Sequence, residues 1–369
     1  MIAKRMRHID SSGIRKVFDK AAQLRDPINL SIGQPDFDVP EPVKEAAIEA
    51  IRAGFNKYTV TQGIPELHQA IRRHIKQTKN MEPEGLLITS GTSGGILLAF
   101  LVLVDPGDEV VFPDPYFVMY KHLTNLVGGV PRYINTYPDF RLRREAVEAA
   151  LGPKTKLLVI NSPCNPTGAV YSRDELQMVA EIAAERGVLV ISDEIYSAFS
   201  YEGPAPSLAA LYPRNTLLLD GFSKSHAMTG WRLGYAAGPA EVIAQMTTLQ
   251  QYSFVCAPSV AQKMGVKALE VATQGYVDEY RRKRNAICNG LKERFEVTRP
   301  SGAFYLFPKA PWGSATQFCE RAIENRLLII PGNVFSERDT HFRIAYAASM
   351  ETIESGIEVL NRLAAQRPA

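Results

Sequence analysis

Between about residues 86 and 238, short apolar runs alternate with longer amphipathic stretches. Six of the runs have the length and the apolar content of strands: Leu86–Thr89, Glu109–Phe112, Leu157–Asn161, Val188–Ser192, Leu217–Asp220 and Arg232–Ala237. Between them, Ser172–Arg186 carries Leu176, Val179 and Ile182 at helical spacing, with charged residues on the opposite side. This alternation predicts an α/β fold in which helices wrap a mainly parallel sheet.

Beyond Gly238 the spacing is helical to about Phe295, with Gln274–Arg294 as one long helix. A smaller α+β region follows, for which we expect two strands and two helices: Gly302–Phe307, His341–Ala345, Ser314–Asn325 and Ser349–Ala364. The first forty-odd residues, which end in Pro40-Glu41-Pro42, are expected to be an arm that packs elsewhere. The predicted division is therefore an arm with part of a small domain, a large ligand-binding domain and a small domain, at residues 1–45, 46–275 and 276–369.

The composition is typical of a globular protein without a strong charge bias. Of 369 residues, 46% are hydrophobic and 22% are charged, and the net charge of +3 gives no electrostatic basis for nucleic-acid binding.

The longest apolar run, Ile96–Val104, has nine residues, about half of what a membrane helix needs. The charged N-terminus does not resemble a signal peptide. Four scattered cysteines and six scattered histidines form no metal-binding pair, so we expect no metal, no membrane partner and a reduced, cytoplasmic setting.

Polar clusters follow several predicted strands at their carboxyl ends, where ligands bind in folds of this kind. The clusters are Gly91-Thr92-Ser93, Asn161 to Gly168, Asp193 to Tyr196, and Ser223-Lys224. Arg232 lies eight positions beyond Lys224. Together these residues supply an amine for an aldehyde, a carboxylate for a ring nitrogen, a phenol for a ring oxygen and a guanidinium for a phosphate. These are the groups that hold pyridoxal phosphate, and they indicate an enzyme of amino-acid chemistry.

Each of these residues also has an ordinary structural interpretation. A lysine after a strand usually lies at a solvated strand end, and an aspartate there usually caps a turn or a helix. Lys224 opens a run of small residues ending in Trp231-Arg232, so we expect an apolar cleft that lowers its basicity and makes it a Schiff-base nucleophile. Asp193 ends an apolar strand, so we expect it to be desolvated and to need a cationic partner, which a pyridinium would provide.

Three further positions carry weaker signals. The glycine-rich loop before Ile96–Val104 could bind phosphate through backbone N–H groups, although it matches neither GxGxxG nor a P-loop. Asn165 lies in a turn rich in Asn and Pro, an ordinary turn composition, and a rigid turn could aim it at a ring oxygen and a substrate carboxylate. Arg343 lies in the alternating strand Phe342–Tyr346. Most strand arginines face solvent, but this one could present its planar fork to a carboxylate.

Taken together, the motifs resemble those of class I/II aminotransferases, the fold type I pyridoxal-phosphate enzymes related to aspartate aminotransferase. The similarity covers nearly the whole chain and includes SIGQPDF at 31–37, YTVTQGIPEL at 58–67, DPYFVMY at 114–120, NSPCNPTG at 161–168, DEIY at 193–196, GFSKSHAMTGWRLGY at 221–235 and FRIAYA at 342–347. The resemblance implies a large domain with a seven-stranded, mainly parallel sheet and a smaller α+β domain. It also implies ping-pong transfer of an amino group from an L-amino acid to a 2-oxo acid, with 2-oxoglutarate as the expected acceptor, through an aldimine of Lys224.

The resemblance also implies a role for each matching residue. Lys224 would bond to the cofactor aldehyde and move the substrate Cα proton, and Asp193 would pair with the ring nitrogen. Tyr196 and Asn165 would donate to the ring oxygen. The residues expected at the phosphate and the ring face are Arg232, Gly91, Thr92, Ser93, Ser223 and Phe117. Those expected at the substrate α-carboxylate are Arg343, Asn165 and Gly33. Tyr58 would reach the phosphate of the other subunit, which implies a homodimer with shared active sites.

Two departures from the family pattern bear on the phosphate and the substrate. Members often have serine three positions before the lysine, where this chain has Gly221, so Ser223 is the expected substitute. Aspartate-specific bacterial relatives commonly have lysine in place of Ser93 and tryptophan in place of Phe117. We therefore expect aromatic or neutral donors rather than aspartate. The loops at 14–18 and 252–257 also shape selectivity and leave the donor open.

Other activities remain possible on this resemblance. A carbon–sulfur β-lyase or a cyclopropane-forming synthase uses the same fold, and a lyase makes pyruvate and ammonia from cystathionine without an oxo-acid acceptor. A ligand-sensing regulator would need an N-terminal helix-turn-helix module, whereas only about thirty residues precede SIGQPDF.

Overall fold

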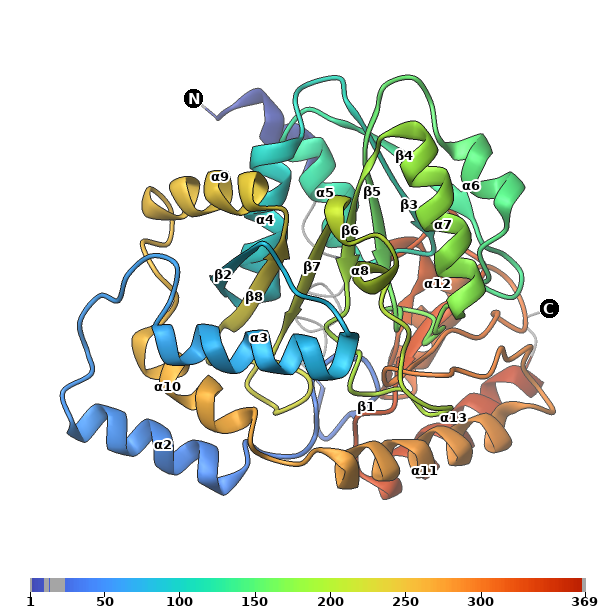
Figure 1. Cartoon of the computed structure of the whole chain (residues 1–369). Coiled ribbons are helices and arrows are strands. Elements are labelled where there is room, and N and C mark those ends of the chain that lie inside the picture. The colour runs from blue at the N-terminus through green and yellow to red at the C-terminus, as the bar shows by residue number, and fades with distance from the viewer. Residues whose placement is uncertain (1, 10–12, 14–23, 367–369) are drawn as a thin grey trace.

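The computed structural model describes residues 2–9, 13 and 24–366. Its largest element is a seven-stranded sheet with the strand order β2-β8-β7-β6-β5-β3-β4 (Figure 1). The strands are β2 (Gly85–Ser90), β3 (Glu109–Asp114), β4 (Val130–Asn135), β5 (Thr155–Asn161), β6 (Leu189–Asp193), β7 (Thr216–Gly221) and β8 (Leu233–Gly238). β8 runs antiparallel to both of its neighbours, and the other pairs are parallel. The sheet confirms the predicted α/β class and its mainly parallel arrangement.

One strand, β4, has no counterpart among the predicted apolar runs. It forms the edge beside β3, and its side chains alternate between exposed and covered positions. Pro131 and Arg132 interrupt its apolar pattern, which an edge strand tolerates because one side of its backbone is unpaired. A search for continuous apolar runs therefore misses this strand.

Helices cover both faces of the sheet because successive residues of a strand point to opposite sides. In β5, Leu157 and Val159 pack with α4 and α9, whereas Leu158 and Ile160 pack with α7. The helices of this part of the chain are α2 (Glu41–Arg52), α3 (Pro65–Lys79), α4 (Gly91–Leu103), α5 (Met119–Leu126), α6 (Arg144–Ala150), α7 (Arg173–Arg186), α8 (Leu208–Leu211), α9 (Ala240–Gln251) and α10 (Ser259–Ala268), with the 3₁₀ turn η2 (Pro213–Asn215).

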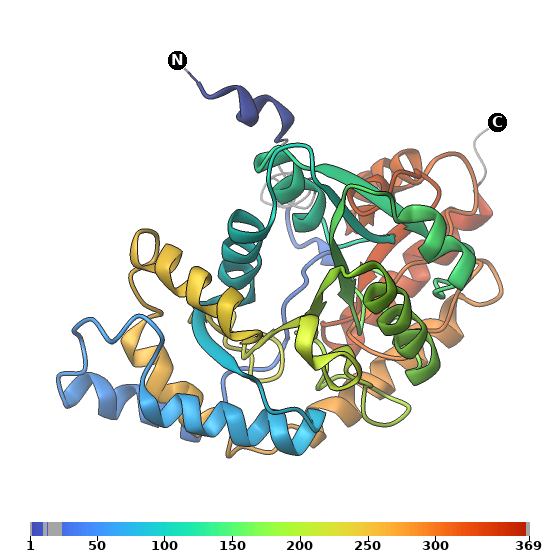
Figure 2. The same ribbon diagram turned by 45° about the horizontal axis from the view of Figure 1, so that its top comes forward.

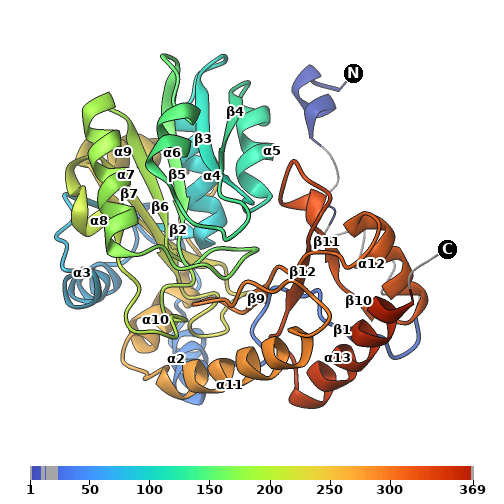
Figure 3. The same cartoon turned by 90° about the vertical axis from the view of Figure 1, so that its right-hand side faces the viewer.

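The C-terminal part of the chain lies beside the large sheet (Figure 3). It contains a three-stranded sheet in the order β11-β12-β9, made of β9 (Tyr305–Leu306), β11 (Ile330–Pro331) and β12 (Phe342–Ala345). Its other elements are α11 (Gln274–Leu291), α12 (Ala315–Glu324), η3 (Gly332–Val334) and α13 (Met350–Ala365). This region confirms the expected smaller α+β part.

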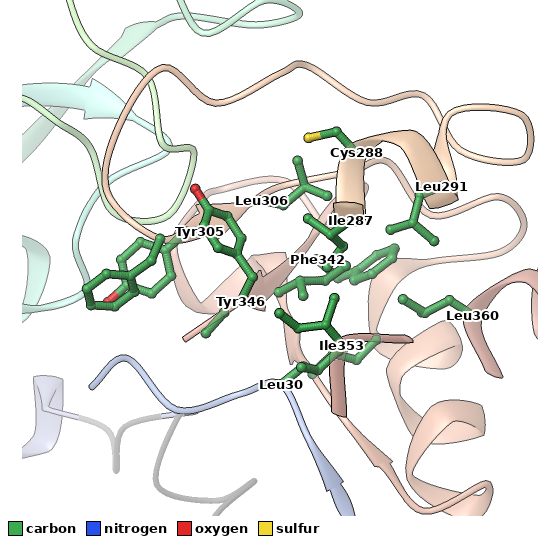
Figure 4. Packing of buried hydrophobic residues seen from close by; sticks show 14 of the residues in the cluster. Leu30, Ile287, Cys288, Leu291, Tyr305, Leu306, Phe342, Tyr346, Ile353 and Leu360 are labelled. Atoms are coloured by element: carbon green, nitrogen blue, oxygen red, sulfur yellow. The ribbon is translucent and has the colours of Figure 1, made fainter. Parts of the chain in front are cut away.

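The segment around β1 (Ile28–Asn29) packs with this C-terminal part, whereas η1 (Lys4–His8) contacts α5 of the large part. β1 pairs in parallel with β10 (Leu327–Leu328). Leu30 belongs to the same buried cluster as Phe342 and Leu360 (Figure 4). Nearer the N-terminus, η1 (Lys4–His8) extends beyond the outline of the remaining chain (Figure 2). The division at residues 45 and 275 stays a prediction.

Several predicted elements have different ends in the structure. The expected strand Gly302–Phe307 is reduced to β9, because Ala303 adopts a left-handed φ of 52° that an extended strand does not allow. The expected helix Gln274–Arg294 ends at Leu291. The helix after the glycine-rich loop begins at Gly91 rather than at Ile96, so the loop residues form its first turn.

Within the described residues, no helix combines the length and apolar character that crossing a membrane requires. The same part of the chain contains no group of three His, Cys, Asp or Glu side chains arranged to hold a metal ion.

Candidate active site

A cavity of about 370 Å³ opens at the carboxyl ends of the central strands, beside the first turn of α4. All but two of the predicted site residues line it: Gly33, Thr92, Ser93, Phe117, Asn165, Asp193, Tyr196, Ser223, Lys224, Arg232 and Arg343. They come from seven separate stretches of sequence. Five of these stretches follow strands of the large sheet, whereas Gly33 and Arg343 come from the N-terminal segment and from β12.

Lys224 follows β7 and reaches across the cavity toward the N-terminal segment. Its Nζ donates a hydrogen bond of 2.7 Å to the carbonyl oxygen of Gly33. Burial lowers the pKa of Lys224 to about 8, and the positive charges of Arg343 and Arg232 act in the same direction. A large share of the amine is therefore neutral near pH 8 and can act as a nucleophile or a base.

Asp193 ends β6 and is 2% exposed. Its Oδ2 accepts a hydrogen bond of 2.6 Å from the Tyr120 hydroxyl, and its Oδ1 accepts a longer one of 3.3 Å from the Ile195 N–H. Burial raises the pKa of Asp193 to about 6 in spite of these two bonds. No cation of the described chain forms an ion pair with this carboxylate, which leaves it suited to a positively charged ligand group.

Behind Asp193, a buried lysine connects two loops of the site. Lys79, at the end of α3, forms ion pairs with Glu194 at 2.6 Å and with Asp220 at 3.2 Å. Glu194 is next to Asp193, and Asp220 precedes the segment that carries Lys224. This buried pairing holds the two loops in a fixed relation.

Arg343 lies in β12 and is 1% exposed, so it does not face solvent as most strand arginines do. Its Nη1 donates to Asn165 Oδ1 at 3.0 Å, and its Nη2 donates to the Ser31 carbonyl oxygen at 2.7 Å. The guanidinium lies between two rings, with the centroids of Tyr305 and Phe335 each 4.7 Å from Cζ. Its Nε has no partner in the described part of the protein, so a donor remains for a ligand.

Arg232 lies against the start of α4. A Cβ atom at position 91 would be 2.5 Å from Arg232 Nη2 and would push the guanidinium away, and the φ of 68° at Gly91 also favours glycine. The first turn of a helix leaves backbone N–H groups unpaired and carries a partial positive charge. Arg232 and this turn, with Thr92 and Ser93 at the cavity, therefore form a place for a phosphate.

Two predicted residues do not line the cavity. Gly91 lies just beneath it, against Arg232. Tyr58 lies in the loop between α2 and α3 and is 83% exposed, and its expected contact with the phosphate of another subunit stays a prediction. The selectivity loop expected at 14–18 lies outside the described residues, and Tyr252 in the other one is 85% exposed.

Several residues of the site were not predicted individually. Tyr120 and Asn161 lie inside motifs that carry the family resemblance, but their contacts with Asp193 depend on the fold. Asn161 donates to the Asp193 carbonyl oxygen at 3.0 Å and thereby joins β5 to β6. Tyr305 lies within the predicted strand Gly302–Phe307, but no motif marks it as a site residue, and its contacts depend on the fold.

The family model for class I and II aminotransferases matches residues 25–360. The chain belongs to this family. This aminotransferase is 37% identical over 376 residues to the probable aspartate aminotransferase of Methanocaldococcus jannaschii, covering 98% of this chain and 100% of that protein. It is 35% identical to the aromatic-amino-acid aminotransferase 2 of Thermococcus litoralis, over 98% of each chain. Among solved structures, it is similar to the aspartate aminotransferase of Thermus thermophilus with maleate, with a TM-score of 0.95, 36% identity and coverage of 98% and 99%.

Enzymes of this family depend on pyridoxal phosphate, and so does this aminotransferase. The cavity fits the cofactor in three respects. The buried Asp193 carboxylate lacks a cation that a protonated ring nitrogen would supply. Gly91 leaves room for the Arg232 guanidinium beside the start of α4, where a phosphate is favoured. Lys224 has the lowered pKa that an amine needs in order to react with an aldehyde.

Proposed function

We propose that this aminotransferase moves an amino group from an L-amino acid to a 2-oxo acid in two half-reactions, with 2-oxoglutarate as the second substrate. The observation that carries the proposal is the convergence on one cavity of a lysine of lowered pKa, a buried carboxylate and a buried arginine, namely Lys224, Asp193 and Arg343. Bound pyridoxal phosphate supplies an electron sink for the charge that develops at the substrate Cα.

Each residue has a part in this proposal. Lys224 would hold the cofactor through its aldehyde and, once released by the substrate, would move the proton from the substrate Cα to the cofactor C4′, a general-base role worth about 10²–10⁴-fold. Asp193 holds the ring nitrogen in its protonated form, and Tyr196 with Asn165 donates to the ring oxygen. Arg343 binds the substrate α-carboxylate, with help from Asn165 and Gly33. The remaining contacts, to the phosphate and the ring face, come from Arg232, Gly91, Thr92, Ser93, Ser223 and Phe117.

For the donor, we propose a neutral or aromatic amino acid. Ser93 lines the cavity at the position where aspartate-specific relatives commonly have lysine, and Phe117 replaces their tryptophan. Relatives named for aspartate and for aromatic amino acids are similarly identical to this chain, so identity alone favours neither.

We also propose a cytoplasmic homodimer with shared active sites. Four exposed apolar side chains on two loops support the dimer, because a monomer would leave them in water: Tyr58, Val60, Tyr252 and Val255. Tyr58 of one subunit would then reach the phosphate of the other.

The test is a panel of amino donors with 2-oxoglutarate, scored by glutamate formation, with borohydride reduction and mass spectrometry to locate the bound cofactor. We expect glutamate from several neutral or aromatic donors and an adduct on Lys224. Pyruvate and ammonia from cystathionine without an acceptor would instead identify a carbon–sulfur β-lyase. Failure to find any adduct on Lys224 would contradict the assignment of its role.

A further inference from the structure

Tyr305 touches two groups of the active site that have separate roles in the proposed function. Its hydroxyl is 2.7 Å from the hydroxyl of Tyr196, and its ring centroid lies 4.7 Å from Cζ of Arg343. The side chain is 1% exposed and lines the cavity. One residue thus contacts both the phenol expected at the ring oxygen and the guanidinium expected at the substrate carboxylate.

The fold fixes the position of Tyr305. β9 pairs antiparallel with β12, and Tyr305 lies opposite Ala345. Residues two apart on a strand share a face, so Arg343 is a diagonal neighbour of Tyr305 on the same face of this sheet. On the other side, a Cβ atom at position 33 would lie 2.6 Å from the Tyr305 hydroxyl, so Gly33 leaves the space that this hydroxyl fills.

The hydroxyls of Tyr196 and Tyr305 carry two protons, and the hydrogen bond between them takes only one of these. Burial raises the pKa of both Tyr196 and Tyr305, so both hydroxyls keep their protons at neutral pH. In the part of the chain that the structure describes, each hydroxyl has the other as its hydrogen-bond partner. Only one proton can lie between the two oxygens. If Tyr305 donates, the proton of Tyr196 is left for a ligand oxygen in the cavity, and hydrogen bonds in such a chain strengthen one another.

We propose that Tyr305 is a positioning residue: its hydroxyl directs the Tyr196 proton into the cavity, and its ring holds Arg343 in place for the substrate carboxylate. The proposal rests on the proposed function, because it takes the ligand oxygen to be the ring oxygen of the cofactor. Phe335 packs on the other face of Arg343 but has no hydroxyl, so Tyr305 alone of these two rings joins Arg343 to Tyr196.

Tyr305→Phe in the cofactor-loaded enzyme separates the two parts of the proposal. It keeps the ring beside Arg343 and removes the hydroxyl. Without substrate, we expect the pH midpoint of the cofactor's visible absorption to rise by on the order of 0.3 units, because a weaker donor at Tyr196 leaves more negative charge on the ring oxygen, which then retains a neighbouring proton to higher pH. Binding of 3-phenylpropanoate, a non-reactive monocarboxylate, should stay unchanged in a calorimetric titration.

Tyr305→Leu removes the ring as well as the hydroxyl. We expect the same shift of the midpoint, together with roughly three- to thirty-fold weaker binding of 3-phenylpropanoate, since a desolvated cation–ring contact is lost. The matched control is Tyr346→Phe, which removes another buried tyrosine hydroxyl of the same core cluster, one that donates to the Ala303 carbonyl oxygen at 3.2 Å. It should change neither quantity.

An unshifted midpoint in Tyr305→Phe would overturn the coupling to Tyr196, and so would an equal shift in Tyr346→Phe, which would indicate a general packing effect. Unchanged 3-phenylpropanoate binding in Tyr305→Leu would overturn the coupling to Arg343. Failure of the wild-type protein to bind pyridoxal phosphate at Lys224 would contradict the proposed function instead, so the two failures are distinguishable.

Discussion

The amine of Lys224 and the carbonyl oxygen of Gly33 are joined by a hydrogen bond of 2.7 Å. Lys224 follows β7 of the large sheet, whereas Gly33 lies next to the segment around Leu30 that packs with the C-terminal part. The bond therefore connects the two parts of the protein across the cavity. The carbonyl oxygen is uncharged and does not stabilise the protonated amine as a carboxylate would, which is consistent with the low pKa of Lys224, about 8.

This pKa predicts how fast the apoenzyme takes up its cofactor at different pH values. Only the neutral amine attacks an aldehyde, so the rate of covalent attachment at Lys224 should rise with pH and reach half of its plateau near pH 8. Stopped-flow absorbance between about pH 6 and about pH 10 measures this rate. Lys224→Ala should show no covalent phase. A rate that keeps rising beyond about pH 10, as for an ordinary lysine, would contradict the prediction.

Asp193 should make the stability of the apoenzyme depend on pH. Because burial raises its pKa to about 6, the native state holds a proton that the unfolded chain releases near pH 4. The stabilising effect of that proton is fully present below about pH 4 and is lost as the pH rises through about 6, a change on the order of 2–3 kcal/mol in the free energy of unfolding. Asp193→Asn should remove this decline.

Urea unfolding of both apoproteins across that pH range, at one protein concentration, measures the difference. Loading the wild-type protein with cofactor provides the control, because the protonated ring nitrogen would then pair with this carboxylate and the decline in stability should disappear. If the free energy of unfolding of the wild-type and Asp193→Asn apoproteins depends on pH in the same way, the Asp193 carboxylate is not the cause of the decline.

Sequence patterns predict the strands and the edge of the sheet where the site forms, but not how its side chains meet. The runs that became β5 and β6 are apolar on both faces, so Asn161 and Asp193 stand out at their ends. The sequence predicts a strand at Gly302–Phe307, but the contact of Tyr305 with Tyr196 also depends on a left-handed turn at Ala303, which leaves no pattern in the sequence. The contact of Tyr58 with the phosphate remains a prediction because that phosphate would be bound in another subunit.

Lys79 is predicted to contribute strongly to stability because its ion pairs are buried. Lys79→Met would leave Glu194 and Asp220 buried without a cation, which should cost about 3–5 kcal/mol. Lys76→Met is a matched control on the same helix. Its ion pair with Glu82 has the same length of 2.6 Å, but the lysine and glutamate side chains are 55% and 76% exposed, against 5% and 3% for Lys79 and Glu194. The control should cost less than about 1 kcal/mol.

Chemical denaturation of the two holoenzyme variants at equal concentration measures these free energies of unfolding. Equal losses would mean that burial does not determine the contribution of Lys79. A loss confined to Lys79→Met, accompanied by weaker cofactor binding, would support its part in holding the loops of Asp193 and Lys224 together.

Ser93 should determine whether aspartate is a good donor. It lines the cavity in the first turn of α4, where a longer side chain can extend into the cavity. Ser93→Lys adds a positive charge there, so kcat/KM for aspartate should rise about three- to thirty-fold relative to a neutral donor, the range expected for a partly desolvated ion pair. Ser93→Met has a similar length without the charge and should leave this ratio unchanged. An equal rise of this ratio in both variants would mean that side-chain length, not charge, causes the effect. An unchanged ratio in Ser93→Lys would mean that the side chain of the donor binds elsewhere in the cavity.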